Sequence, residues 1–240
     1  MSKLKVALCL HGKFDSLNDN TSKGADGYDH INNRIFSRVE PDIFIHSWDV
    51  QQEDEICNLY KPKNCIFEDQ IDFSPQAKHL NFIPNPPRTP ETILSHFYSV
   101  SESIKLACEN DIYDIIIKAR FDLGRINRNT SGPHNAQNPH PVQCISFEPE
   151  LDMTNLYMAN WQYIDIDGPA DMWFYSNQDN MSKLRDLYKF TLEDSFDIGG
   201  DYVSSLENIN DLPNAIKLYK QFFIKHDLWD KKLLLDTVFE

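Results

Sequence analysis

The sequence predicts an α/β protein in which helices flank a mainly parallel sheet. The run of three isoleucines at 115–117 is typical of a strand that is buried on both faces, and residues 4–10 and 42–48 predict two further strands, the second with a polar tip at His46 and Ser47. Helical patterns separate these runs within the first 124 residues, as the crossover connections of parallel strands require. Charged residues follow the isoleucine run directly, and ligands in open α/β sheets bind outside the carboxyl ends of the strands.

Local signals predict each element of the first half. The first strand is closed by His11 and Gly12, and the long polar loop 13–26 that follows is typical of a loop over a site. Thr89 is the expected cap of a helix that starts at Pro90 and runs to about residue 110. The other elements expected here are a helix at 28–39, a strand at 42–48, a short helix at 54–60 and a strand at 64–68.

The second half has more loops and is expected to lie over the strand ends. Residues 125–141 are polar and predict an insertion loop, whereas 162–175, QYIDIDGPADMWFY, predict a strand, a Gly-Pro turn and a second strand. The other expected elements are strands at 142–147, 156–161 and 233–239, helices at 179–190 and 213–226, and an irregular acidic segment at 193–211.

Composition excludes several classes of function. The formal net charge of −14 disfavours a nucleic-acid partner, because phosphate neutralisation needs a basic face. The five cysteines are odd in number and lack C-x-x-C spacing, which predicts reduced thiols in a cytoplasmic protein and no zinc site. The apolar run 6–10 is too short for a signal segment or a membrane span, and we expect no transmembrane segment elsewhere.

The central strand, within YDIIIKARFDLG at residues 113–124, carries the strongest functional signal. Lys118 and Arg120 have the same strand parity, so their side chains are expected on one side of the strand, close to Asp122. The alternative interpretation is a solvated strand end with a local ion pair.

Four segments, in chain order, resemble small glycosyltransferases of the GT-A type, which occur in capsule and lipopolysaccharide gene clusters and in large viruses. They are DIFIHSWD, ILSHFYSVSESIKLACEND leading into YDIIIKARFDL, GPADMWFYSNQDNMSKLRDLY, and AIKLYKQFFIKHDL. In that family the central strand ends in an R-x-R-P-D-L-like run, whereas here Lys118 replaces the first arginine and Phe121 replaces the proline. The resemblance implies one domain over residues 1–240, with a nucleotide-binding half at 1–124 and an acceptor-side half at 125–240.

The resemblance also implies a reaction in polysaccharide biosynthesis. A hexosyl or pentosyl group would move from a nucleotide-diphosphate sugar to a hydroxyl of a glycan acceptor. Charge on the leaving diphosphate calls for a divalent metal or cations, so Mn²⁺ or Mg²⁺ is expected at Asp122, with Lys118 and Arg120 facing phosphate or sugar. Asp171 is the expected general base, and Trp173 is expected to stack on the acceptor sugar. The remaining donor-site candidates end the first two strands or lie on the helix before the central strand: His11, Gly12, Ser47, Trp48, Tyr98 and Ser99.

Alternatives exist for several of these roles. Asp165 and Asp167 form a literal D-x-D, and in a strand their carboxylates would point to one side as a metal requires; the other interpretation is a solvated turn or strand face. Asp171 would otherwise be a turn or capping residue, and Trp173 a core residue.

Two other functions remain open at this point. A non-catalytic nucleotide-sugar or glycan-binding module is the first, because Phe121 departs from the family pattern and no second aspartate adjoins Asp122. A phosphate-handling enzyme of another α/β family is the second. This function is disfavoured because the chain lacks the G-x-x-x-x-G-K-[ST] and G-x-S-x-G motifs. A dinucleotide-binding fold is disfavoured separately, because the fingerprint G-x-G-x-x-G is also missing.

Overall fold

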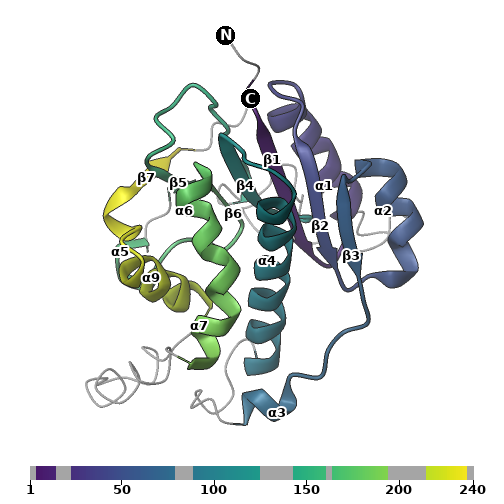
Figure 1. The fold of residues 1–240 in the computed structure, drawn as a ribbon, viewed down its shortest axis with the longest axis vertical. Helices are drawn as coiled ribbons and strands as arrows, with labels where there is room; N and C mark the ends of the chain where they lie inside the picture. Colours follow the sequence, from purple (N-terminus) through teal and green to yellow (C-terminus); the bar gives the residue numbers. More distant parts are fainter. Residues whose placement is uncertain are drawn as a thin grey trace, which may run out of the picture.

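A computed structural model describes residues 4–14, 23–78, 89–124, 143–160, 164–193 and 215–236. Within these residues seven strands form one mixed sheet, in the order β3-β2-β1-β4-β6-β5-β7 (Figure 1). Four neighbouring strands are parallel: β3 (Asn64–Phe67), β2 (Asp42–Ser47), β1 (Val6–Gly12) and β4 (Ile115–Arg120). The strand β6 (Trp173–Ser176) runs antiparallel to β4 and to β5 (Leu156–Ala159), and β7 (Lys232–Leu235) is parallel to β5.

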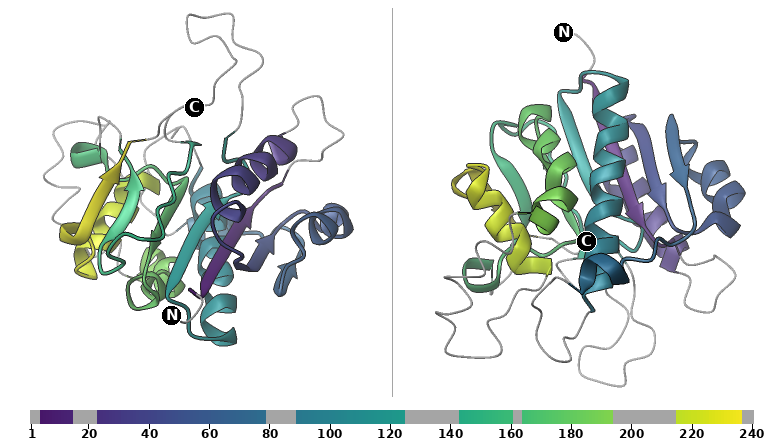
Figure 2. Two further views of the ribbon diagram at one scale, coloured as in Figure 1. Left: turned by 90° about the horizontal axis from the view of Figure 1, so that it is seen from above. Right: turned by 60° about the horizontal axis from the view of Figure 1, so that its bottom comes forward.

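Helices cover both faces of this sheet, which confirms the predicted fold class. One face packs on α4 (Pro90–Asn110), α6 (Gln178–Met181), α7 (Leu187–Glu193) and α9 (Ala215–Lys225). Figures 1 and 2 show α4 in front of the sheet, with α6 and α7 in green beside it. The opposite face packs on α1 (Lys23–Ile31), the π-helical turn Asn32–Phe36 and α2 (Glu53–Tyr60). Three further short helices lie at Ser74–Ala77 (α3), Ile164–Asp167 (α5) and Ser182–Asp186 (η4).

The helix α4 follows its sequence signals closely. The Thr89 side chain accepts a hydrogen bond from the backbone N–H of Thr92, and Pro90 occupies the first helical position. The predicted apolar stripe, which includes Ile93 and Phe97, is buried against the sheet. This packing fixes the helix over β1, β2 and β4, where the polar strand ends lie.

Two predicted strands are wrong. Residues 143–148 are described and contain no strand, although 142–147 was expected to form one. The segment expected as strand, turn and strand instead forms the helical turn α5 at Ile164–Asp167, and β6 begins only at Trp173. The alternating pattern I-D-I-D imitates a half-buried strand.

The five cysteines are all free thiols, as predicted; Cys9 and Cys144 are buried and the others are partly buried. Across the described ranges, we find no helix that combines the length and the apolar character needed to cross a membrane.

Candidate functional site

The carboxyl ends of three parallel strands bring polar side chains into one row. The pairing register places His11 of β1 opposite His46 of β2 on one side and opposite Arg120 of β4 on the other. Because paired residues of neighbouring strands point to the same face, all three lie on the side covered by α4. The His96 ring of α4 packs edge-on against the His11 ring, with ring centroids 5.1 Å apart.

A cleft of about 790 Å³ opens at this edge of the sheet. Residues from β1, the ends of β2 and β4, the segment after β3 and the first turns of α4 line it. They are His11, Gly12, Lys13, Trp48, Gln70, Ile71, Asp72, Phe73, Ser74, Glu91, Thr92, Ser95, His96, Arg120 and Asp122. The cleft therefore contains five of the residues predicted for the donor site: His11, Gly12, Trp48, Arg120 and Asp122.

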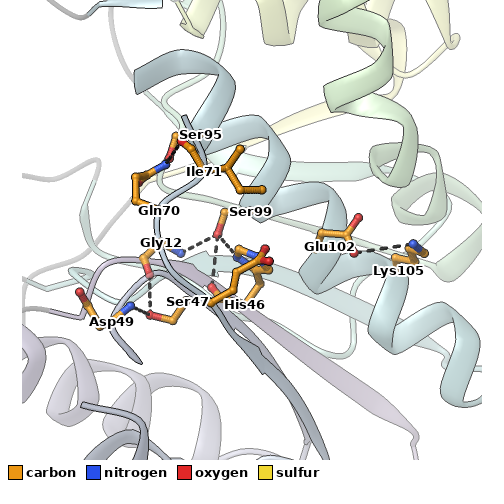
Figure 3. Close-up of polar contacts among 11 residues, drawn as sticks. Gly12, His46, Ser47, Asp49, Gln70, Ile71, Ser95, Ser99, Glu102 and Lys105 are labelled. Atoms are coloured by element: carbon orange, nitrogen blue, oxygen red, sulfur yellow. Dashed lines mark hydrogen bonds and ion pairs between the residues drawn. The ribbon is translucent and has the colours of Figure 1, made fainter. Parts of the chain in front are cut away.

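Ser99 and Ser47 join the ends of β1 and β2 through hydrogen bonds (Figure 3). The Ser99 Oγ accepts a hydrogen bond from the Gly12 N–H at 3.0 Å and lies 2.8 Å from Nδ1 of His46. The Ser47 Oγ donates to the Gly12 carbonyl at 2.9 Å. Both serines are fully buried and lie outside the cleft lining, so the predicted direct contact with a donor does not fit their positions.

Aromatic rings form the cleft wall at the end of β2. The Trp48 ring stacks on Tyr98 with centroids 5.6 Å apart and contacts Phe73 edge-on. Trp48 and Phe73 line the cleft, whereas Tyr98 lies behind Trp48 and does not. The structure therefore indicates a packing role for Tyr98, and the expected contact with a donor does not fit its position.

Arg120 holds two carboxylates from different parts of the chain. Its Nε and Nη2 donate to the two oxygens of Asp122 at 2.8 and 2.7 Å, and its Nη1 donates to Asp171 Oδ2 at 3.2 Å. Burial lowers the pKa of Arg120, but the charges of Asp122 and Asp171 outweigh burial and raise that pKa above its ordinary value. The guanidinium is thus permanently charged, and its charge is offset by two acids.

Aromatic packing fixes the turn that carries Asp122. Phe121 is fully buried and packs edge-on against Phe14 and Tyr60, with centroids 5.6 and 5.7 Å apart. Gly27 of α1 lies so close that a Cβ there would be 1.7 Å from the Phe121 carbonyl oxygen. Phe121 therefore anchors the turn from the opposite side of the sheet, although it replaces the proline of the family pattern.

Lys118 does not face the cleft. Its side chain is fully buried; Nζ donates to the Asp171 carbonyl and lies 4.8 Å from the Phe174 ring centroid and 5.4 Å from that of Tyr219. Burial lowers the pKa of Lys118 to about 7. Lys118 and Arg120 point to the same face of β4, as predicted. Lys118 lies two residues before Arg120 and is buried in the core, so the expected contact with phosphate does not fit its position.

Asp171 and Trp173 also lie inside the protein. The Asp171 side chain is 9% exposed, and its Oδ2 lies 3.8 Å from Nε2 of His96, which in turn is 3.0 Å from the Tyr219 hydroxyl. Trp173 is fully buried and donates from Nε1 to the Cys144 carbonyl. For Trp173 the core interpretation is correct, and stacking on an acceptor sugar does not fit.

The described residues contain no cluster of three or more protein ligands for a metal, whether His, Cys, Asp or Glu. Both oxygens of Asp122 accept hydrogen bonds from Arg120. Asp165 of the literal D-x-D belongs to a helical turn instead of a strand, and its side chain is 82% exposed; the Asp167 side chain lies outside the described atoms.

Sequence reasoning expected Tyr98 and Ser99 of α4 at the site but missed the α4 side chains that line the cleft. Thr92, Ser95 and His96 precede Ser99 by seven, four and three residues, so helical spacing places them on the same face. Because Ser99 was already a donor-site candidate, this spacing could have indicated that the three residues lie at the same site. Residues 70–74 also line the cleft, but their approach depends on tertiary packing, which no local pattern encodes.

No protein-family model and no curated protein matches this sequence. Among solved structures, it is similar to a glycosyltransferase involved in the glycosylation of the major capsid of PBCV-1, with 9% identity, coverage of 97% of this chain and 82% of that chain, and a TM-score of 0.41. Mouse xyloside xylosyltransferase 1 gives 12% identity, coverage of 98% and 85%, and a TM-score of 0.44. The glycosyltransferase GlyE of Streptococcus pneumoniae TIGR4 gives 9% identity, coverage of 98% and 46%, and a TM-score of 0.39.

Proposed function

We propose that this chain is a glycosyltransferase that moves a sugar from a nucleotide-diphosphate sugar to a hydroxyl of a glycan acceptor. The observation that carries the proposal is the cleft of about 790 Å³ at the carboxyl ends of β1, β2 and β4. Open α/β sheets bind ligands at this edge, and the volume is in the range of small-molecule binding sites. Aromatic, cationic and acidic side chains converge there, as binding and transfer of such a ligand require.

The proposed chemistry needs a proton acceptor for the acceptor hydroxyl. Asp171 is the candidate, since Arg120 holds its carboxylate in place. Because the side chain is poorly exposed, the acceptor would have to reach it past Arg120 and His96, the two cleft-lining residues next to it. A base that is fixed in orientation and shielded from water is suited to this step.

Metal use is a separate part of the proposal. Mn²⁺ or Mg²⁺, when bound, would neutralise charge on the leaving diphosphate. Asp122 is the candidate ligand, but it would first have to exchange a hydrogen bond from Arg120 for the metal. Transfer of a hexose or pentose, within cytoplasmic polysaccharide biosynthesis, is likewise proposed.

The second candidate function is a non-catalytic nucleotide-sugar or glycan-binding module. The pairing of Asp122 with Arg120 favours it, because that pairing occupies the candidate metal ligand. A thermal-shift screen of UDP-, GDP-, CMP- and dTDP-sugars, with and without Mn²⁺, tests both candidates, and mass spectrometry of products follows for any hit. Binding with turnover supports the transferase, binding without turnover supports the module, and no shift with any nucleotide-sugar contradicts both.

A further inference from the structure

We infer that the described cleft binds the uncharged, polyhydroxylated ring of a sugar and that the phosphates lie outside it, beyond the turn that carries Asp122. This inference rests on the proposed function, which supplies the sugar-containing ligand. It goes further because it assigns one part of that ligand to one set of side chains and predicts which variants discriminate between the parts.

The charge of the cleft wall is the first argument. Among the described residues, its lining contains two cations, Lys13 and Arg120, and three acids, Asp72, Glu91 and Asp122, so with neutral histidines its formal charge is −1. Arg120 is also offset from behind by Asp171. A diphosphate brought into this wall would be repelled by it at short range, whereas an uncharged ring would not.

The hydrogen-bonding groups of the wall are the second argument. Gln70, Ser74, Thr92 and Ser95 contribute neutral amide and hydroxyl groups, which both donate and accept hydrogen bonds. A sugar hydroxyl has the same dual character, whereas an ionised phosphate accepts only. Trp48 adds an aromatic surface for the apolar face of a ring.

His11 is the third argument. The residue lines the cleft, is 1% exposed, and neither ring nitrogen has a hydrogen-bond partner among the described residues. Burial, followed by the charge of Lys118, lowers the pKa of His11 well below its ordinary value, so the ring is neutral, with one donor and one acceptor. Unpaired buried groups of this kind are costly. A change of rotamer at His96, which packs against this ring, would bring sugar hydroxyls to the His11 nitrogens.

Calorimetry on the full chain tests the inference with three variants. His11→Phe keeps the ring shape and removes both nitrogens, and Ser95→Ala removes a cleft hydroxyl. Ser103→Ala is the matched control, because it lies two turns further along α4 and its hydroxyl donates to the Val100 carbonyl of the same helix. If the cleft holds the ring of the donor, each cleft variant should weaken binding of the nucleotide-sugar found in the screen by roughly three- to tenfold, and in either case it should change binding of the matching nucleoside diphosphate less than twofold.

The ligands also distinguish which sugar occupies the cleft. If the cleft variants lose affinity only for the nucleotide-sugar, the ring in the cleft is that of the donor. Loss of affinity for the methyl glycosides of glucose, galactose, mannose or xylose, with nucleotide-sugar affinity intact, assigns the ring of the acceptor. Equal weakening of nucleotide-sugar and nucleoside diphosphate, or no change for any ligand, overturns the inference.

A separate measurement applies if the wild-type chain binds no nucleotide-sugar, a result that contradicts the proposed function. Amide chemical shifts at Thr92 and Ser95 are then followed with the same methyl glycosides and with inorganic pyrophosphate. Shifts with a glycoside and none with pyrophosphate support a sugar-binding cleft without the transfer function. Shifts with pyrophosphate, or with neither kind of probe, overturn the inference.

Discussion

Arg120 donates two hydrogen bonds to Asp122, from Nε to Oδ1 at 2.8 Å and from Nη2 to Oδ2 at 2.7 Å. Such a two-pronged pair is strong and fixes the relative orientation of both side chains. The residue expected to bind phosphate and the residue expected to bind metal are therefore partners of each other in the free protein.

We expect Arg120→Ala to destabilise the fold by about 3–5 kcal/mol, because two poorly exposed carboxylates lose their shared counter-charge. Urea unfolding monitored by circular dichroism measures this change. Arg38→Ala is the matched control: its pair with Glu148 has a similar separation of 2.7 Å, but both side chains are about 40% exposed. The Arg38→Ala substitution should lower the free energy of unfolding by about 1 kcal/mol or less.

Binding is tested with the same variant. Arg120→Ala should weaken nucleotide-sugar binding by a few kcal/mol at most, because Asp122 and the turn that carries it lose the charge-assisted hydrogen bonds that order them. Unchanged affinity in the folded variant would show that the donor binds away from the end of β4.

The buried lysine predicts a dependence of stability on pH. The folded-state pKa of Lys118 is about 7, below its value in the unfolded chain. Between the two values the unfolded chain binds one more proton than the folded protein, so the penalty for burying Lys118 is full below pH 7 and is relieved as pH rises. Lys118→Met has no such penalty. The free energy of unfolding of Lys118→Met should exceed that of the wild type by a difference that shrinks by about 1.4 kcal/mol per pH unit between pH 7.5 and 9.5.

Urea unfolding at several pH values measures the difference between Lys118→Met and the wild type. Lys105→Met is the control, since that lysine lies on α4 with its side chain 49% exposed. Its stability profile should run parallel to that of the wild type. A parallel profile for Lys118→Met as well would mean that Lys118 keeps an ordinary pKa in the folded protein.

The effect of Mn²⁺ on activity should differ between variants of Asp122 and of Asp165. Asp122→Asn keeps the shape of the side chain and removes its charge, so Mn²⁺-stimulated transfer, or hydrolysis of the nucleotide-sugar, should be lost while the protein still folds. Asp165→Asn should leave both intact, because its exposed side chain lies on α5 and is absent from the cleft lining. Loss of activity in Asp165→Asn or Asp167→Asn, with Asp122→Asn active, would assign the metal to the literal D-x-D. Activity that chelation with EDTA leaves unchanged would remove the metal from the mechanism.

Local patterns predicted those parts of the fold that depend on local forces. The apolar run of β2, expected at 42–48, and the capped start of α4 at Pro90 agree with the structure because buried strands and helix caps leave signatures in adjacent residues. The helical turn α5 was missed: Gly168 donates to the Ile164 carbonyl and Lys220 of α9 donates to that of Asp165, and only the first partner is local.

The same limit applies to the site. Strand parity placed Lys118 and Arg120 on one side of β4 but gave neither their depth nor their partners. Lys118 pairs with Cys9 of β1, inside the core. Arg120 pairs with His11, and both of these residues line the cleft. Asp171, which Arg120 contacts, is 51 residues further along the chain, so no local pattern indicates the pair.

Asp171→Asn tests general-base catalysis at the proposed site. The substitution removes the proton-accepting charge, so transfer should slow by roughly two to four orders of magnitude, the usual contribution of a general base. Donor affinity should stay nearly intact, because the cleft lining does not include Asp171. The measurements are single-turnover transfer rates, donor calorimetry and melting temperature. Normal turnover with a lowered melting temperature would instead show a structural role, in which the carboxylate serves Arg120 only. Loss of donor affinity would place Asp171 in the nucleotide-sugar pocket and the acceptor elsewhere.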